Sequence, residues 1–208
     1  MDEIKRRPGR PKGTEKRGEK KYMTNEQLRA FFRAVERDRR DDFMFNLMFF
    51  VGARVQEIAN ITCEDINGDS QQVTIKGLKG GTTRVYTMPD KLYKKYKRWM
   101  KDREKIKGAA MNPYLFITNK SQDNKPISRD MIQWLFRKYM QTAGLKGFYP
   151  HSLRHSIAIA RARAGHNAVR IRNWLRQRDL KTAQNYVDMY GKEAQEDERE
   201  ATEIYESL

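Results

Sequence analysis

The nearly continuous apolar run of residues 43–51, Phe-Met-Phe-Asn-Leu-Met-Phe-Phe-Val, is the feature that most constrains the fold. A helix that is apolar on almost every side must be buried. The run ends at Gly52, and a second helix is predicted from about Gln56. With 208 residues, the chain is long enough to bury this helix in one good-sized core.

Further helices and two strands are predicted around this buried segment. Thr24 and Gln27 form a capping-box pattern, after which apolar residues recur at helical spacing. Two extended segments, 73–76 and 83–88, flank glycines that supply a turn. Helices are predicted over 91–103, 128–142, 151–164, 167–175 and 181–189. The expected fold class is therefore mainly α with a small antiparallel β-sheet (α+β).

Charge is the main indication of a partner. The chain has 43 Lys and Arg against 27 Asp and Glu, a net charge of +16. Such an excess attracts phosphate, so nucleic acid is the leading partner class and an anionic membrane surface the second. The single cysteine, Cys63, excludes an internal disulfide and a cysteine-rich zinc site. No apolar run approaches the ~18 residues of a membrane span, and the N-terminus lacks the apolar stretch of a secretory signal, so we expect an intracellular protein without a membrane span.

The two ends of the chain differ from the body in composition. Residues 1–22 have almost no large apolar side chains and are expected to be disordered. Within them, Arg-Arg-Pro-Gly-Arg-Pro-Lys-Gly at 6–13 resembles an AT-hook, which lies in the minor groove of A·T-rich DNA; a plain flexible leader is the alternative. Residues 191–208 hold seven acidic and two basic residues. They are expected to form an acidic tail, either a solvated helix or an arm that docks on a neighbouring subunit.

The densest group of chemically active side chains lies at 151–155. A helix there places His151, Arg154 and His155 on one face, whereas Leu153 points toward the core. Clustering such groups is unfavourable for packing and indicates an anionic guest, with a metal ion as the rival. No nearby Cys or carboxylate pair completes a metal-ligand set, so no metal is expected and phosphate handling is favoured.

Four segments resemble, in the right order, the signature boxes of the tyrosine recombinases, the phage integrase family. Residues 52–58, Gly-Ala-Arg-Val-Gln-Glu-Ile, are similar to the first-arginine box, and Lys79-Gly80 in the turn is similar to the lysine hairpin. Residues 151–165 resemble the second box, and Tyr186 falls at the position of the nucleophile. The resemblance covers residues 23–188 and implies a catalytic domain of this family over 23–190.

The resemblance also implies what each matched residue does. Arg54 and Arg154 would clamp the non-bridging oxygens of the scissile phosphate, because guanidinium forks onto oxygens and stays charged. His151 would accept the proton of Tyr186 and return it, and Lys79 would protonate the departing 5′ oxygen. The product would be a 3′-phosphotyrosine and a free 5′ hydroxyl, formed without ATP, metal or another cofactor.

Other residues are expected to support this chemistry or to contact DNA. Glu57 and His155 would orient the catalytic cluster rather than react. The residues expected to contact DNA are Arg7, Arg10, Lys12, Arg84, Arg176 and Arg178.

One position departs from the family pattern. The family usually has Leu-Gly-His or Leu-Gly-Trp nine residues before the nucleophile, where this chain has Leu-Arg-Gln at 175–177. Gln177 can donate a hydrogen bond to the phosphate but cannot transfer a proton, so reduced rather than abolished activity is expected.

Two assignments have rivals. Tyr190 lies one helical turn after Tyr186, and Lys76 lies shortly before Lys79. The spacing of the boxes favours Tyr186, and the glycine that follows Lys79 favours that lysine.

The resulting hypothesis is a site-specific DNA recombinase similar to small, catalytic-domain-only members such as the fimbrial DNA invertases. The partners would be double-stranded DNA and three further copies, a homo-tetramer on paired sites that is a monomer or weak oligomer without DNA. The location would be cytoplasmic and nucleoid-associated. The alternatives are a non-catalytic DNA-binding regulator or accessory factor and a strand-relaxing enzyme of the type IB topoisomerase kind.

Overall fold

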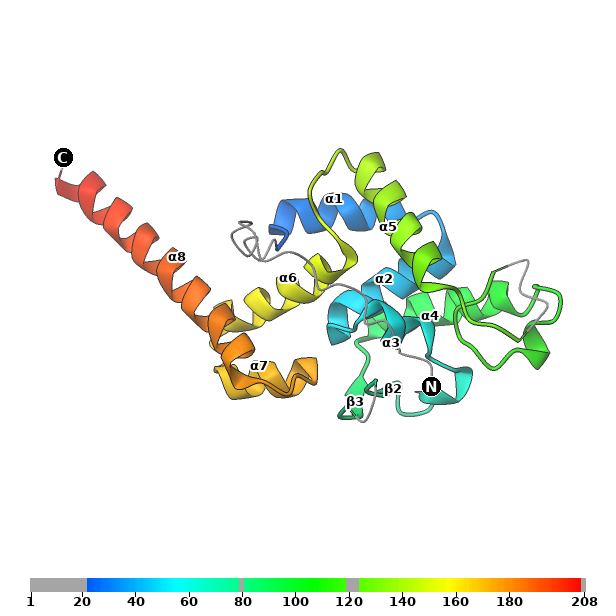
Figure 1. Cartoon of the computed structure of the whole chain (residues 1–208). Coiled ribbons are helices and arrows are strands. Elements are labelled where there is room, and N and C mark those ends of the chain that lie inside the picture. Colours follow the sequence, from blue (N-terminus) through cyan, green and yellow to red (C-terminus); the bar gives the residue numbers. More distant parts are fainter. Residues whose placement is uncertain (1–21, 79–80, 119–123, 207–208) are drawn as a thin grey trace, which may run out of the picture.

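The computed structural model describes residues 22–78, 81–118 and 124–206. The fold is mainly helical with one small antiparallel sheet, as the sequence predicts (Figure 1). The helices are α1 (Asn25–Val35), α2 (Arg39–Val51), α3 (Val55–Ala59), α4 (Asp90–Arg103), α5 (Arg129–Thr142), α6 (Pro150–Arg163), α7 (Ala168–Leu175) and α8 (Leu180–Glu206). The strands are β1 (Ile66–Asn67), β2 (Gln72–Ile75) and β3 (Arg84–Thr87), and the 3-10 turns are η1 (Cys63–Asp65) and η2 (Ala109–Met111).

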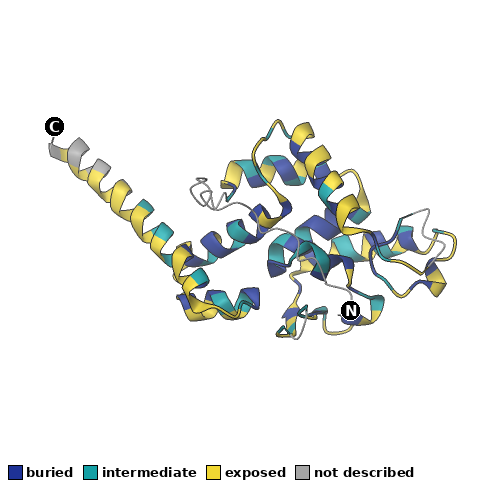
Figure 2. Cartoon of the chain, viewed as in Figure 1, coloured by how far each residue is buried: buried dark blue, intermediate teal, exposed yellow. Residues whose placement is uncertain are grey.

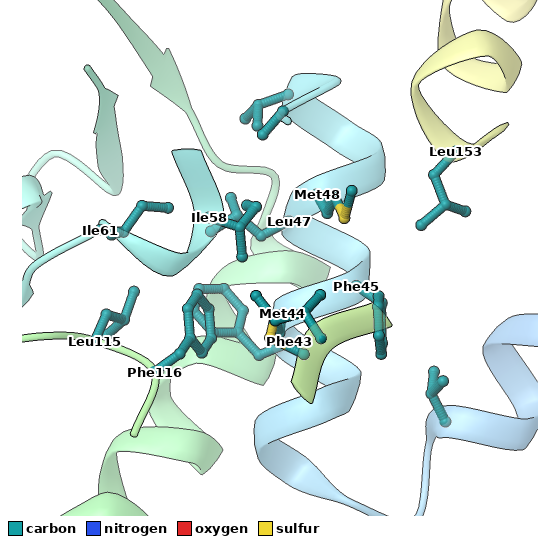
Figure 3. Close-up of a cluster of buried hydrophobic side chains, with 14 of the residues drawn as sticks. Phe43, Met44, Phe45, Leu47, Met48, Ile58, Ile61, Leu115, Phe116 and Leu153 are labelled. Atoms are coloured by element: carbon teal, nitrogen blue, oxygen red, sulfur yellow. The ribbon is translucent and has the colours of Figure 1, made fainter. Parts of the chain in front are cut away.

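Helix α2 forms the centre of the main core, which confirms the buried helix predicted at 43–51. It begins earlier than expected because the Asp38 side chain caps it, accepting a hydrogen bond from the backbone of Asp41. Helices α1, α4 and α6 pack around it. Figure 3 shows its buried Phe and Met side chains in one cluster with Ile58 of α3, with Leu153 of α6 and with Phe116 from the segment between η2 and α5.

The sheet is a short meander in the order β1–β2–β3. The two predicted strands are confirmed, each within one residue of the expected bounds, and their pairing places Val73 opposite Tyr86. β1 has only two residues, too few to show an alternating pattern in the sequence. Val73 and Ile75 of β2 and Tyr86 of β3 are buried, so one face of this sheet packs on the body.

A second, smaller core joins the ends of α6, α7 and α8. Its centre is formed by Ile159 of α6, Ile171 and Leu175 of α7, and Ala183 and Tyr186 of α8, all of them buried. A tyrosine in an apolar core normally keeps its hydroxyl near a polar partner. A polar partner is therefore expected beside the hydroxyl of Tyr186.

The last helix is much longer than predicted. The predicted end of this helix at 189 is wrong: α8 continues to Glu206 through Gly191 and the acidic residues. The helical course of residues 191–206 agrees with the solvated helix that was one alternative for the acidic tail. Glu193, just past the glycine, pairs with Arg163 of α6 at 2.8 Å and accepts a hydrogen bond from Tyr22, which holds the helix across its weakest residue. Beyond that point the described side chains of α8 are exposed, and the helix projects from the body (Figures 1 and 2).

No helix in the described part of the chain is long and apolar enough to cross a membrane.

Candidate active site

The first turn of α6 brings three of the predicted site residues together. Pro150 opens the helix, where its fixed backbone angle is favourable. His151 is exposed, His155 is half-buried and Arg154 is 1% exposed. The two imidazole rings meet edge to face with their centroids 4.7 Å apart. The helical spacing of these residues therefore produces a single cluster of cationic and titratable groups.

Arg154 joins the ends of α2 and α7. Its guanidinium donates hydrogen bonds to the backbone oxygen of Gly52 and to that of Leu175, the second at 2.7 Å. Burial, together with the nearby charge of Arg54, lowers the pKa of Arg154 to about 10. The side chain thus remains charged at neutral pH, and its position is fixed by backbone atoms of two helices.

Gly52 makes this close approach possible. Its φ of +59° lies in the left-handed region that glycine adopts without strain. A Cβ at this position would overlap the Leu175 side chain and lie 3.2 Å from Ile157. The glycine after the buried helix is therefore required both for the turn and for the packing around Arg154.

Arg54 lies directly after this turn and caps α3 together with Glu57. The backbone N–H and the guanidinium of Arg54 each donate to a different Glu57 oxygen, both at 2.8 Å. The Glu57 side chain is fully buried, whereas the Arg54 side chain is 42% exposed. The carboxylate therefore anchors one side of the Arg54 guanidinium and leaves the rest facing the surface.

The side chain of Arg176 does not lie at the surface, contrary to the prediction. Arg176 was expected to contact DNA, but its side chain is only 1% exposed and points into the protein, where it donates to Glu57 at 2.8 Å. It also donates to the backbone oxygen of Val51 at 3.2 Å and to the hydroxyl of Tyr86. Its backbone ends α7 in the left-handed conformation, with φ of +54°. The buried Glu57 carboxylate needs a counterion, because an unpaired charge in the interior is strongly unfavourable.

The Tyr186 hydroxyl lies within this group of residues. It is 2.8 Å from Nδ1 of His155 and is also hydrogen-bonded by the side chain of Gln177. Burial raises the pKa of Tyr186, and the positive charge of Arg154 opposes that rise. The phenol is therefore protonated at neutral pH. The imidazole of His155 is in hydrogen-bond contact with it, whereas the sequence predicts that His151 takes its proton.

Two of these side chains, Arg154 and Gln177, help to line a pocket of ≈ 700 Å³. Arg54, His151, Arg154 and Gln177 contribute to its wall, and Arg178 and Thr182 extend it toward α8. The pocket is rich in Arg and His side chains, so it is suited to an anion. Within the described residues, no group of three His, Cys, Asp or Glu side chains is arranged to hold a metal ion.

Comparison with known proteins assigns this arrangement to a family. The model of the phage integrase family matches residues 21–193. The chain belongs to the phage integrase family. A tyrosine recombinase, XerA, from Pyrococcus furiosus is 29% identical over 177 residues, which cover 85% of this chain and 60% of that protein. The type 1 fimbriae regulatory protein FimE of Escherichia coli is 24% identical over 172 residues, covering 81% of this chain and 85% of FimE.

Solved structures show the same fold. The crystal structure of XerA recombinase matches with a TM-score of 0.74 at 23% identity, over 86% of this chain and 65% of that one. XerH site-specific recombinase bound to its difH substrate, in a pre-cleavage complex, matches with a TM-score of 0.67 at 22% identity, over 79% of this chain and 49% of that one. This integrase-family chain spans about 60% of the length of the XerA relative.

The lysine hairpin of this integrase-family domain is described only in part. Lys79 lies outside the described residues, although Leu78 and Gly81 on either side of the gap line the pocket. The rival lysine, Lys76, is paired with Asp65 at 2.7 Å. The predicted DNA contacts of the N-terminal tail, Arg7, Arg10 and Lys12, also lie outside the described residues.

The remaining predicted residues lie around the pocket. Arg178 is exposed at its wall. The Arg84 guanidinium lies 5.1 Å from the ring centre of Trp174 and 5.3 Å from that of Tyr86, so it is held by aromatic faces. Tyr190, the rival nucleophile, is half-buried one turn beyond the pocket residues.

The structure adds two aromatic residues that sequence reasoning missed as site residues. The hydroxyl of Tyr86 in β3 donates to the backbone oxygen of Trp174 in α7 and accepts from Arg176. The Trp174 indole in turn donates to the backbone of Phe50 at 3.1 Å. These contacts join the strand after the lysine hairpin to the end of α7. These hydrogen bonds could not be predicted from a local sequence pattern, because they join residues that are far apart in the sequence.

Proposed function

We propose that this chain is a site-specific DNA recombinase that cleaves and rejoins strands through a 3′-phosphotyrosine. The observation that carries the proposal is the environment of Tyr186. Its hydroxyl contacts His155 and Gln177 and lies near Arg154. Gln177 and Arg154 in turn line, together with Arg54, a pocket that is suited to an anion. Membership of the phage integrase family supports the same chemistry.

The proposed reaction begins when a DNA phosphate enters the pocket. The guanidinium groups of Arg54 and Arg154 neutralise its non-bridging oxygens and stabilise the charge that develops in the transition state. The Tyr186 oxygen attacks phosphorus while its proton passes to the neighbouring imidazole of His155. The bond from phosphorus to the 5′ oxygen breaks, and that oxygen receives a proton from Lys79.

Rejoining is the same reaction in reverse. A 5′ hydroxyl attacks the phosphotyrosine, the phosphodiester forms again, and Tyr186 recovers its proton. The phosphotyrosine conserves the energy of the original phosphodiester bond, so rejoining needs no external source of energy. If the attacking 5′ hydroxyl comes from another DNA, the strands are exchanged.

A nicked suicide substrate tests the proposal. The substrates are duplexes that carry inverted repeats identified by sequencing next to the gene, and each is nicked near the cleavage point so that the released 5′ end diffuses away. We expect a covalent protein–DNA adduct with the parent chain and none with Tyr186→Phe, because only the hydroxyl is lost. Tyr190→Phe is the matched control and should retain the adduct. An adduct that persists in Tyr186→Phe, or is lost only in Tyr190→Phe, contradicts the assignment.

One observation favours a second candidate, a DNA-binding regulator or accessory factor without cleavage. Gln177 occupies the position where the family usually has His or Trp, and an amide cannot transfer a proton. Tight binding to a flanking repeat without any adduct would support this candidate. If an adduct forms, transfer of the strand to a second DNA separates recombination from relaxation of supercoils.

The proposed partner is double-stranded DNA, and the proposed assembly is a tetramer on two paired sites. Crystal structures of relatives in complex with DNA support the first part. The exposed outer half of α8 is proposed as the arm that contacts a neighbouring subunit. Sedimentation with and without a paired-site DNA should give a tetramer only with DNA, and removal of residues 194–208 should prevent it. Such a protein would be located at the nucleoid.

A further inference from the structure

Arg176 provides a second counterion for Glu57. The fully buried Glu57 carboxylate is contacted on one oxygen by the Arg54 guanidinium and on the other by Arg176, each at 2.8 Å. The two arginines differ in exposure: the Arg54 side chain is 42% exposed and faces the pocket, whereas that of Arg176 is 1% exposed. Only one of the two is therefore free to reorient toward a ligand.

Arg176 is also held on the side away from Glu57. It donates to the backbone oxygen of Val51 at 3.2 Å and to the hydroxyl of Tyr86, and its guanidinium carbon lies 5.4 Å from the centre of the Tyr86 ring. These contacts come from α2 and β3. The guanidinium thus has a fixed place between three elements that surround the pocket.

The backbone of Arg176 indicates that the side chain matters. Its φ of +54° is a conformation that glycine adopts freely and that strains a residue with a Cβ. The family pattern has glycine at this position. A strained arginine here is stabilised by its contacts with Glu57, Val51 and Tyr86.

We propose that Arg176 is a positioning residue, which keeps Glu57 neutralised so that the Arg54 guanidinium can turn toward a DNA phosphate. When Arg54 engages the phosphate, its hold on Glu57 weakens. A carboxylate left buried without a counterion is strongly unfavourable, and it would pull Arg54 back. Arg176 removes that competition while remaining in place. The inference rests on the proposed function.

Because Glu57 can be protonated, the effect of Arg176 on the cleavage rate should depend on pH. Burial raises the pKa of Glu57, while the charge of Arg176 and the backbone N–H of Arg54 lower it, and the net shift is downward. Arg154 on α6 is the other charged group that faces it. Without Arg176 the effect of burial gains weight, so the pKa of Glu57 rises. A protonated Glu57 needs no counterion and releases Arg54.

The test measures single-turnover cleavage of the suicide substrate by Arg176→Gly, in which glycine suits the backbone. At pH 8 we expect a rate about tenfold to a hundredfold below that of the parent chain. The ratio of parent to variant rate should shrink as pH falls, because Glu57 becomes neutral in the variant. Arg176→Lys, which keeps the charge, should recover part of the rate. Adding Glu57→Gln to Arg176→Gly should also recover part of it.

A role only in folding predicts a different result. The deficit of Arg176→Gly would then be the same at every pH, and Glu57→Gln would add a further loss. Either result, or a parent-like rate in Arg176→Gly, overturns the proposal. If Arg176→Gly does not fold, Arg176→Gln and Arg176→Lys carry the same comparison.

A binding measurement separates this inference from the proposed function. If the parent chain forms no adduct, recombination fails as the function, and the affinity for a duplex containing the flanking repeats is measured by fluorescence anisotropy. Because Arg176 acts through Arg54, Arg54→Ala combined with Arg176→Gly should bind no more weakly than Arg54→Ala alone. Losses that multiply would overturn the inference independently of any cleavage.

Discussion

Gln177 keeps a hydrogen-bond donor beside the Tyr186 hydroxyl but has no group that can transfer a proton. Its amide contacts the Tyr186 hydroxyl, and its own oxygen is buried without a hydrogen-bond partner among the described atoms. An amide donor stabilises the oxygen of the nucleophile but cannot deliver a proton to it or remove one. The imidazole of His155, 2.8 Å from this hydroxyl, is therefore the group that we propose to take its proton.

Gln177→His should therefore increase activity. An imidazole at this position can transfer protons, and we expect single-turnover cleavage to rise roughly tenfold. Gln184→His, at an exposed position on α8, is the matched control because it adds an imidazole away from the hydroxyl. An unchanged or lower rate in Gln177→His would show that the amide is as effective as the imidazole, or that the ring does not fit.

At the scale of single residues, the sequence predicts which side chains share a helical face but not where each side chain points. The positions 151, 154 and 155 on one helical turn could be predicted because helix geometry is periodic. The inward turn of Arg176 could not, because it depends on Glu57, which is distant in sequence. The choice between His151 and His155 as neighbour of Tyr186 likewise depends on how α8 packs on α6.

The C-terminal ends of α2 and α7 meet the N-terminal half of α6 around Gly52. Arg154 bonds to the backbone at the ends of α2 and α7, and Leu175 packs on the glycine itself. An error in the relative position of these helices would move Arg154. The contact is therefore as important for the site as for stability.

Gly52→Ala tests this contact against a matched glycine. Both Gly52 and Gly108 have positive φ, but a Cβ on Gly108 would meet nothing within 4 Å. Gly108→Ala should lower the free energy of unfolding by about 1 kcal/mol, the strain of the left-handed backbone alone. Gly52→Ala should lower it by about 2–4 kcal/mol, since steric overlap adds to the strain. Equal losses in urea unfolding would show that the helices separate without difficulty.

Elements with strong local signals were predictable, and those stabilised at long range were not. The capping box at Thr24 and the cap at Ser128 set the starts of α1 and α5 as expected. The length of α8 was missed because Gly191 and a run of acidic residues read as the end of a helix. Contacts of Glu193 with Arg163 and Tyr22 carry the helix through the glycine.

Over the whole molecule, the excess of positive charge is the feature that favours the proposed DNA partner. The net charge of +16 is large for 208 residues, and the first 21 residues contribute nine basic and four acidic side chains to it. Binding that neutralises phosphates releases counterions, so affinity must fall steeply with salt. The N-terminal tail is proposed to supply part of that effect.

Removal of residues 1–21 should therefore weaken DNA binding and flatten its salt dependence. The slope of log affinity against log salt should decrease by about 1 for each phosphate contact that the tail provides. The experiment uses anisotropy on A·T-rich and G·C-rich duplexes, and the loss should be larger on the first because of the AT-hook-like sequence. Unchanged affinity and slope on both duplexes would exclude a role of the tail in binding.

Helix α8 has a mechanical consequence. Its 27 residues correspond to a rod of roughly 40 Å, with Tyr186 near one end and an exposed stretch at the other. The contact between Glu193 and Arg163 lies between the two and acts as a fulcrum. The segment proposed to dock on a neighbouring subunit and the proposed nucleophile thus belong to one continuous helix, so the position of either constrains that of the other.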